Sequence, residues 1–251
     1  MAEPSEYNLI TFGPEGETER RMDFVDLVRN CPIPDQELLL NLGLFLTPQT
    51  LSRVLFMDFL YRQVLDVQGV VMEFGCRWGQ NSSLFTAMRG IYEPFNRLRR
   101  VVAFDTFTGF PSVRPEDGTQ VNVGDYATTK GYEHFLDQVL THQEKESPLN
   151  HLRKYEIVKG DVRETVPRYL DQHQETTIAL AYFDLDLYEP TVACLKAIKD
   201  RITRGTVLGF DEANDPSMPG ETIAIREALD LSRYSLKRYR YNARTSYVVI
   251  E

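Results

Sequence analysis

The stretch that decides the fold is GVVMEFGCRWGQNS, residues 69–82. Its first part is a short apolar run that ends in Glu73, Phe74 and a glycine, which is typical of a buried parallel strand entering a loop. Gly75 and Gly79 then lie four residues apart, ahead of a helical pattern at 81–95. Open α/β sheets bind ligands at such turns, because glycine lets the backbone approach the ligand closely. An ordinary strand-to-helix turn could carry the same two glycines, so the loop alone is weak evidence for a binding site.

Strands and helices alternate on both sides of this loop. Apolar residues recur at helical spacing over 51–65, and a short helix is expected at 21–29. Downstream, the pattern predicts strands at 100–105, 155–159, 178–184 and 206–211, with helices at 131–143, 163–172, 190–202 and 221–231. The last two strands, 235–241 and 246–250, are joined too closely for a crossover helix and must pair antiparallel. This predicts an α/β fold of the class I methyltransferase (Rossmann-like) type: a mostly parallel seven-stranded sheet with an antiparallel C-terminal hairpin and an N-terminal helical extension.

The composition and charge of the chain argue against several classes of protein. The chain has 251 residues and a net charge of −9, which argues against a protein that binds nucleic acid by neutralising phosphates. No apolar run reaches the roughly 18–20 residues that span a bilayer, and the first ten residues lack a signal-peptide pattern. The three cysteines are far apart and indicate neither a disulfide framework nor a zinc site. We therefore expect a cytoplasmic protein with no membrane or nucleic-acid partner.

Polar residues at the strand ends indicate a nucleoside cofactor. Asp105 ends the strand after the glycine loop, where a carboxylate can accept hydrogen bonds from both ribose hydroxyls. Asp161 follows the next strand and can reach an adenine amino group. The loop lacks the tighter glycine pattern of dinucleotide sites, which favours S-adenosylmethionine, a cofactor without phosphate. The candidate cofactor-binding residues are Glu73, Gly75, Gly79, Asn81, Ser82, Asp105, Phe107, Asp161 and Val162.

Four carboxylates follow the next two strands. Asp184 and Asp186 are two residues apart, so an extended backbone would direct both side chains the same way, and Asp211 and Glu212 end the neighbouring strand. Crowded carboxylates repel unless a cation or a proton-transfer task compensates, and hard oxygen ligands suit Mg²⁺ or Ca²⁺. Some of these acids could instead cap helices or face solvent.

The ordered motifs resemble those of the macrocin O-methyltransferase family, S-adenosylmethionine-dependent enzymes that methylate sugar hydroxyls in antibiotic pathways. The resemblance covers residues 51–251 and rests on EFG at 73–75, FDTFTGFP at 104–111, GDY at 124–126, GD at 160–161, DLDLYEPT at 184–191, DE at 211–212 and PGET at 219–222. It looks closest to enzymes that act on deoxyhexoses, whose acceptor is a small-molecule sugar or a glycosylated natural product.

The resemblance also implies roles for individual residues. Gly75, Asp105 and Asp161 would hold the cofactor, and Asp186 would be the catalytic general base. Asp184, Asp211 and Glu212 would bind a divalent metal such as Mg²⁺. The chain departs from the family pattern at Glu212, where an aspartate is usual, and at Arg77-Trp78, where the order is usually reversed.

Two other functions remain open. A metal-dependent catechol-type O-methyltransferase shares the fold and the acids but acts on an aromatic diol. A non-catalytic nucleotide-binding protein shares the fold alone, and would not need the acidic cluster.

Three regions have expected roles. Residues 67–251 form the methyltransferase domain, and the long loop 106–130 is a candidate lid. Residues 1–66 form an arm with helices, whose apolar stretches 38–46 and 51–65 favour a homo-oligomer. Alternatively, both stretches fold back on their own domain.

Overall fold

The computed structural model describes residues 14–251 and centres on a seven-stranded sheet of order β3-β2-β1-β4-β5-β7-β6. The strands β1 to β5 run parallel, and β7 lies antiparallel to both β5 and β6. Their bounds are β1 (Val70–Phe74), β2 (Val101–Asp105), β3 (Tyr155–Lys159), β4 (Ile178–Phe183), β5 (Ile202–Phe210), β6 (Lys237–Arg238) and β7 (Ser246–Val249). The predicted sheet and its antiparallel C-terminal pair are confirmed.

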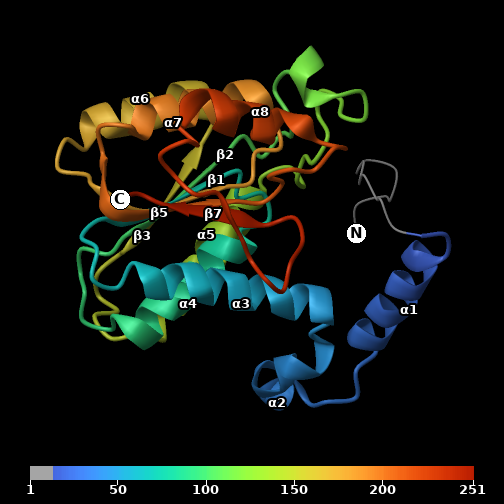
Figure 1. The fold of residues 1–251 in the computed structure, drawn as a ribbon. Helices are drawn as coiled ribbons and strands as arrows, with labels where there is room; N and C mark the ends of the chain where they lie inside the picture. The colour runs from blue at the N-terminus through green and yellow to red at the C-terminus, as the bar shows by residue number, and fades with distance from the viewer. Residues whose placement is uncertain (1–13) are drawn as a thin grey trace.

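Helices cover both faces of the sheet (Figure 1). One layer comprises α3 (Pro48–Gln63), α4 (Gln80–Tyr92) and α5 (Tyr132–Lys145), and the other comprises α6 (Val162–Gln172), α7 (Tyr188–Ile198) and α8 (Pro219–Ala228). Alternate residues of β1 pack into different layers: Met72 and Phe74 join the core under α6–α8, whereas Val71 joins the core under α3–α5. Strands buried on both faces explain the continuous apolar runs of the sequence.

The C-terminal hairpin is shorter than predicted. The expected strand at 235–241 contains only the two residues of β6, both exposed at the edge of the sheet. The chain leaves the edge at Tyr239, whose ring packs at 4.8 Å from the ring of Phe56 and 5.3 Å from that of Phe59. The Tyr239 N–H still donates to the Thr245 carbonyl at 3.2 Å, and the aromatic contacts with α3 hold the chain where the strand pairing ends.

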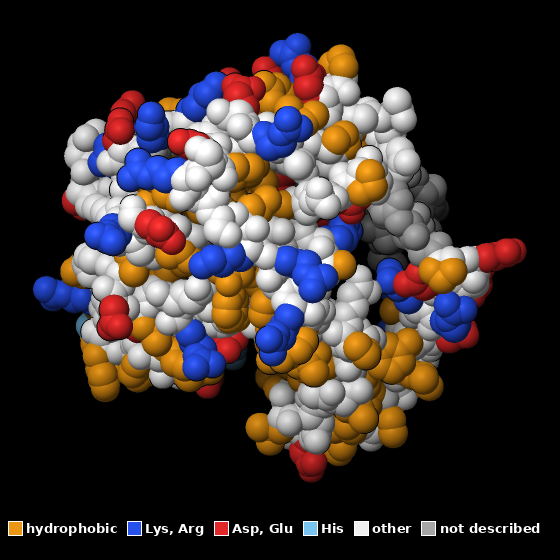
Figure 2. All heavy atoms as spheres, viewed as in Figure 1, with side chains coloured by type: hydrophobic (Ala, Val, Ile, Leu, Met, Phe, Trp, Pro, Cys, Tyr) orange, Lys and Arg blue, Asp and Glu red, His pale blue; other side chains and the backbone are white. Residues whose placement is uncertain are grey.

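The N-terminal elements stand apart from the sheet (Figure 1). They are α1 (Glu17–Arg29), α2 (Asp35–Leu38) and the 3₁₀ helix η2 (Leu39–Phe45), none of which has a buried residue. Leu40 is 86% exposed and Leu44 66% exposed, and Figure 2 shows hydrophobic side chains gathered on this part of the molecule. Residues 1–13 of the predicted arm lie outside the described part.

Helix α3 behaves differently from the elements before it. Its residues Phe56, Met57, Leu60 and Tyr61 are completely buried against the domain. The alternative that the apolar stretches fold back on their own domain therefore applies to α3 and not to 38–46. Within residues 14–251, no single helix is long and apolar enough to cross a bilayer. The α2–η2 segment and α3 have the required length and apolarity only when taken together, and a bend of 91° separates them.

Candidate functional site

A cavity of about 410 Å³ opens at the carboxyl ends of the parallel strands. Residues at the ends of β1, β2, β3, β4 and β5 and in the loops after them line it, together with the start of α3. The predicted residues in its lining are Gly75, Asn81, Asp105, Asp161, Val162, Asp184, Asp186, Asp211 and Glu212. Glu73, Gly79, Ser82 and Phe107 are buried in the structure around the cavity and are not among its lining residues.

The loop after β1 requires its first glycine. Gly75 has a φ of +86°, and a Cβ there would lie 1.9 Å from the carbonyl oxygen of Asp184. The β1 and β4 loops therefore meet at a distance that only glycine allows. Gly79 has a φ of +73° and precedes α4 as its N-cap residue.

Glu73 holds the residues that follow this loop in place. Its carboxylate is completely buried and accepts hydrogen bonds from Asn81 Nδ2 at 2.9 Å and from the Ser82 hydroxyl. Burial raises the pKa of Glu73 to about 7, although the bonds from Ser82 and Asn81 oppose that rise. Glu73 thus fixes the first turn of α4, and among these three residues only Asn81 reaches the cavity.

Asp105 connects two of the loops that line the cavity. Its Oδ1 accepts a hydrogen bond from the Phe107 N–H at 2.6 Å, and its Oδ2 accepts one from the Arg77 N–H at 2.7 Å. Each carboxylate oxygen keeps a further acceptor site, so Asp105 can still bind a ligand hydroxyl. Phe107 contributes its backbone, since its ring belongs to the core under α3–α5.

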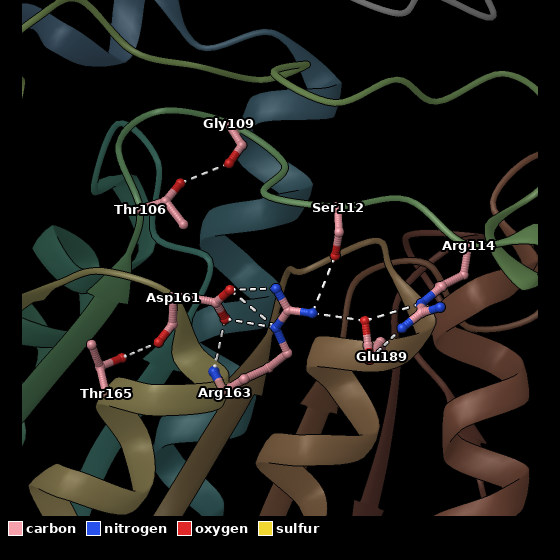
Figure 3. A network of polar contacts seen from close by, with 8 residues as sticks. All are labelled: Thr106, Gly109, Ser112, Arg114, Asp161, Arg163, Thr165 and Glu189. Carbon is pink, nitrogen blue, oxygen red and sulfur yellow. Dashed lines mark hydrogen bonds and ion pairs between the residues drawn. The ribbon is translucent and has the colours of Figure 1, made fainter.

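Asp161 is already engaged in a polar network (Figure 3). It caps α6 by accepting from the Arg163 N–H at 2.9 Å, and it also accepts from Arg163 Nε at 3.0 Å. Arg163 donates to Glu189 at 2.7 Å and to the Ser112 hydroxyl at 3.2 Å, while Arg114 pairs with Glu189 at 3.0 Å. Because Ser112 and Arg114 belong to the loop 106–130, the network fastens this predicted lid to α6 and α7.

Three carboxylates meet at the other end of the cavity. Asp184, Asp186 and Glu212 each offer one oxygen, and the three oxygens lie within 4.8 Å of one another. The predicted reason for the pairing of Asp184 and Asp186 is wrong: β4 ends at Phe183, and Asp186 adopts a left-handed φ of +61° instead of an extended conformation. A loop turn, and not strand alternation, brings these side chains together.

Asp211 is held by two other residues. Arg53 from α3 donates to Asp211 Oδ2 at 2.9 Å and lies 3.4 Å from Asp184, and the Tyr182 hydroxyl donates to Asp211 Oδ1 at 2.5 Å. Burial raises the pKa of Asp211, but Arg53 and Tyr182 outweigh burial and lower it overall. The predicted metal set of Asp184, Asp211 and Glu212 thus shares two residues with the three-carboxylate group, and Asp211 stays a predicted ligand that Arg53 and Tyr182 hold beside that group.

Two arginines at this site were not predicted. Arg244, in the turn before β7, donates to Glu212 at 2.7 Å and lies 2.9 Å from Asp215. Arg53 shares a helix face with Phe56, Met57 and Leu60. An arginine on an otherwise apolar face indicates a buried acidic partner, so the sequence pattern could have identified Arg53 as a site residue. No comparable pattern marks Arg244.

The acidic group fits a divalent cation. Burial, followed by the neighbouring carboxylates, raises the pKa of Asp184 and of Glu212 well above their ordinary values. Glu212 Oε2 is buried and has no hydrogen-bond partner in the described structure. Hard oxygen donors that repel one another and leave one atom open are the kind of set that Mg²⁺ uses.

Residues 58–225 match the family described as macrocin-O-methyltransferase (TylF). The chain is 44% identical to CalS11, described as a calicheamicin methyltransferase, with a TM-score of 0.92 over 99% of this chain and 98% of that one. It matches an apo structure of CalS11, described as a TDP-rhamnose 3'-O-methyltransferase of calicheamicin biosynthesis, at 44% identity and a TM-score of 0.84, over 95% and 96% of the chains.

The O-methyltransferase NovP, 19% identical over 79% of each chain with a TM-score of 0.55, shares the fold. No curated protein sequence matches this chain.

Proposed function

Because this chain belongs to the macrocin O-methyltransferase family, as its motifs predicted, we propose that it transfers a methyl group from S-adenosylmethionine to a hydroxyl of a deoxyhexose in antibiotic biosynthesis. The observation that carries the proposal is the order of groups along one cavity. Asp161 follows β3, Asp105 ends β2, the glycine loop follows β1, and the acidic group follows β4 and β5. A nucleoside site thus adjoins a site that can deprotonate a hydroxyl.

The nucleoside half would hold the cofactor. Asp105 is rigidly placed by two backbone N–H groups and has acceptor sites left for the ribose hydroxyls. Gly75 allows close approach of the methionyl part, and Val162 and Phe110 offer apolar surface to the adenine. S-adenosylmethionine supplies an electrophilic methyl group, so the protein has to supply orientation and a base.

The acidic half would prepare the acceptor. A sugar hydroxyl is a poor nucleophile until its proton is being removed, and Asp186 is the carboxylate that we assign as the general base. Asp184 and Glu212, with Asp211 beside them, would hold a divalent cation, which lowers the pKa of a hydroxyl bound to it. Arg53 fixes Asp184 and Asp211 in place, and Arg244 fixes Glu212.

The acceptor that we propose is a nucleotide-linked deoxyhexose. Support comes from the 44% identity over nearly the whole chain with CalS11, which is described as acting on TDP-rhamnose. The test is to incubate the protein with S-adenosylmethionine and, in parallel, TDP-rhamnose, free rhamnose, or catechol, and to detect methylated product by mass spectrometry. Methylation of the nucleotide sugar alone is expected. Methylation of catechol alone would favour the aromatic-diol enzyme, and no product from any acceptor would favour a non-catalytic protein.

We also propose that the protein is a homo-oligomer. The exposed leucines of η2 form an apolar surface of the kind that another subunit covers. Light scattering should give a mass above that of one 29.0 kDa chain. A monomer at micromolar concentration would contradict this proposal and leave the proposed activity untouched.

A further inference from the structure

Arg77 is a cavity residue to which the mechanism above gives no role. It lies in the loop after β1, two residues beyond Gly75, and its backbone N–H donates a hydrogen bond to Asp105 Oδ2 at 2.7 Å. Its φ of +45° is in the left-handed region, which is uncommon for a residue with a side chain. The backbone therefore holds the start of this side chain in one place.

The guanidinium of Arg77 rests against two aromatic rings. Its Cζ lies 4.8 Å from the ring centroid of Tyr126 and 5.6 Å from that of Trp78. Within residues 14–251, no carboxylate lies within ion-pair distance of it, and its Nε is buried without a hydrogen-bond partner. The other two arginines of the cavity, Arg53 and Arg244, each pair with two acids.

The start of α4 also favours an anion beside Arg77, whose guanidinium feels the charges of Asp184, Asp186 and Asp105 only from beyond ion-pair distance. Helix α4 has thirteen residues, and its first two, Gln80 and Asn81, line the same cavity. Its first turn contains no acidic residue, and its N-cap Gly79 offers no side chain to the free N–H groups. The positive end of the helix dipole and the unpaired guanidinium thus face one space.

We infer that Arg77 binds the carboxylate of the methionyl group of S-adenosylmethionine, an inference that rests on the proposed function. Asp161, Asp105 and the β1 loop follow one another across the sheet, which places the methionyl part of the cofactor beside Arg77 when its ribose is on Asp105. That group is a zwitterion, so it needs a cation for its carboxylate and an acceptor for its ammonium. Arg77 supplies the cation for the carboxylate.

The test compares two ligands by calorimetry. One is S-adenosylhomocysteine, and the other is its decarboxylated analogue S-adenosyl-3-thiopropylamine, which keeps the ammonium and lacks the carboxylate. The proteins are the unmodified chain, Arg77→Gln, Arg77→Lys and the control Arg153→Gln. Arg153 is a matched control because it also stacks on an aromatic ring, at 4.4 Å from the centroid of Tyr155, but pairs with Asp137 outside the cavity.

The unmodified chain should bind S-adenosylhomocysteine about 10- to 100-fold more tightly than the analogue, the usual worth of a charge-assisted hydrogen bond. In Arg77→Gln this preference should fall to within about 3-fold, because only the carboxylate ligand loses affinity. Arg77→Lys keeps the charge without the planar fork and should give an intermediate preference, whereas Arg153→Gln should keep the full one.

Three results would overturn the inference. One is a full preference in both Arg77 variants. Another is an equal loss of affinity for both ligands, which would mark Arg77 as a support of the loop. The third is that Arg77→Gln binds S-adenosylhomocysteine as tightly as the unmodified chain does but binds a nucleoside diphosphate more weakly than that chain, which would assign the guanidinium to the acceptor. If the unmodified chain binds neither adenosyl ligand, the proposed function itself fails; if it binds both equally, only the inference fails.

Discussion

Replacing Asp186 with asparagine tests the assignment of the general base most directly. Asp186 is 8% exposed and has a φ of +61°. Asparagine is nearly isosteric with aspartate and is one of the few side chains that accept the left-handed region readily. Alanine would add backbone strain of roughly 1–2 kcal/mol, so Asp186→Ala would confuse a catalytic effect with a structural one.

The expected loss follows from the role of the side chain. The amide keeps one oxygen and the shape of the carboxylate, so binding of S-adenosylhomocysteine should change little. It cannot take a proton, and kcat should fall by about 10²- to 10⁴-fold, the usual worth of a positioned base. That range corresponds to about 3–5 kcal/mol of transition-state stabilisation.

The assay is steady-state turnover of the nucleotide sugar by mass spectrometry, with calorimetry of S-adenosylhomocysteine alongside. Asp184→Asn is the matched control, because its carboxylate belongs to the same three-carboxylate group. It should make activity depend on a higher Mg²⁺ concentration. Near-normal turnover in Asp186→Asn, together with loss of activity in Asp184→Asn at every Mg²⁺ concentration, would exchange the two roles. Full activity of the unmodified enzyme in excess EDTA would refute metal assistance and leave the base assignment intact.

Four further outcomes are expected. Asp105→Ala should weaken S-adenosylhomocysteine binding by about 1–3 kcal/mol, and unchanged affinity in calorimetry would contradict the ribose assignment. Gly75→Ala should abolish that binding, because its Cβ would lie 1.9 Å from the Asp184 carbonyl oxygen; a variant that binds normally would show that the two loops can separate. Glu73 has a folded-state pKa of about 7, above its ordinary 4.5, so its burial costs stability increasingly as pH rises through this interval. Glu73→Gln should therefore gain about 2 kcal/mol relative to the unmodified chain between pH 5.5 and pH 8 in urea unfolding, and a constant difference would argue against the raised pKa. Leu40→Glu should convert the oligomer to monomers in light scattering while leaving the thermal stability of the domain unchanged, since this side chain is 86% exposed.

The sequence was informative wherever local pattern determines geometry. Parallel strands end on one edge of a sheet, so residues at or just after their ends, such as Asp105 and Glu212, could be placed at one cavity in advance. Glu73 was also conspicuous, because a carboxylate inside an apolar strand needs a partner, and Asn81 supplies one.

Contacts between distant segments could not be predicted in the same way. Arg53 meets Asp211 across 158 residues of chain, and Arg244 meets Glu212 across 32. Such pairs depend on how α3 and the C-terminal turn pack against the sheet. The local spacing of apolar residues does not determine that packing. The left-handed turn at Asp186 was missed because neither glycine nor asparagine marks it.

The position of Arg53 has a consequence for how the rate varies with protein concentration. Arg53 lies six residues after Thr47, the N-cap of α3, and the apolar η2 segment ends just before that cap. The residue that holds Asp184 and Asp211 thus belongs to the helix that begins where the exposed leucines end. A second subunit that covers those leucines would therefore also restrain the end of α3 that carries Arg53. Turnover per molecule would then decline on dilution, even at saturating concentrations of both substrates.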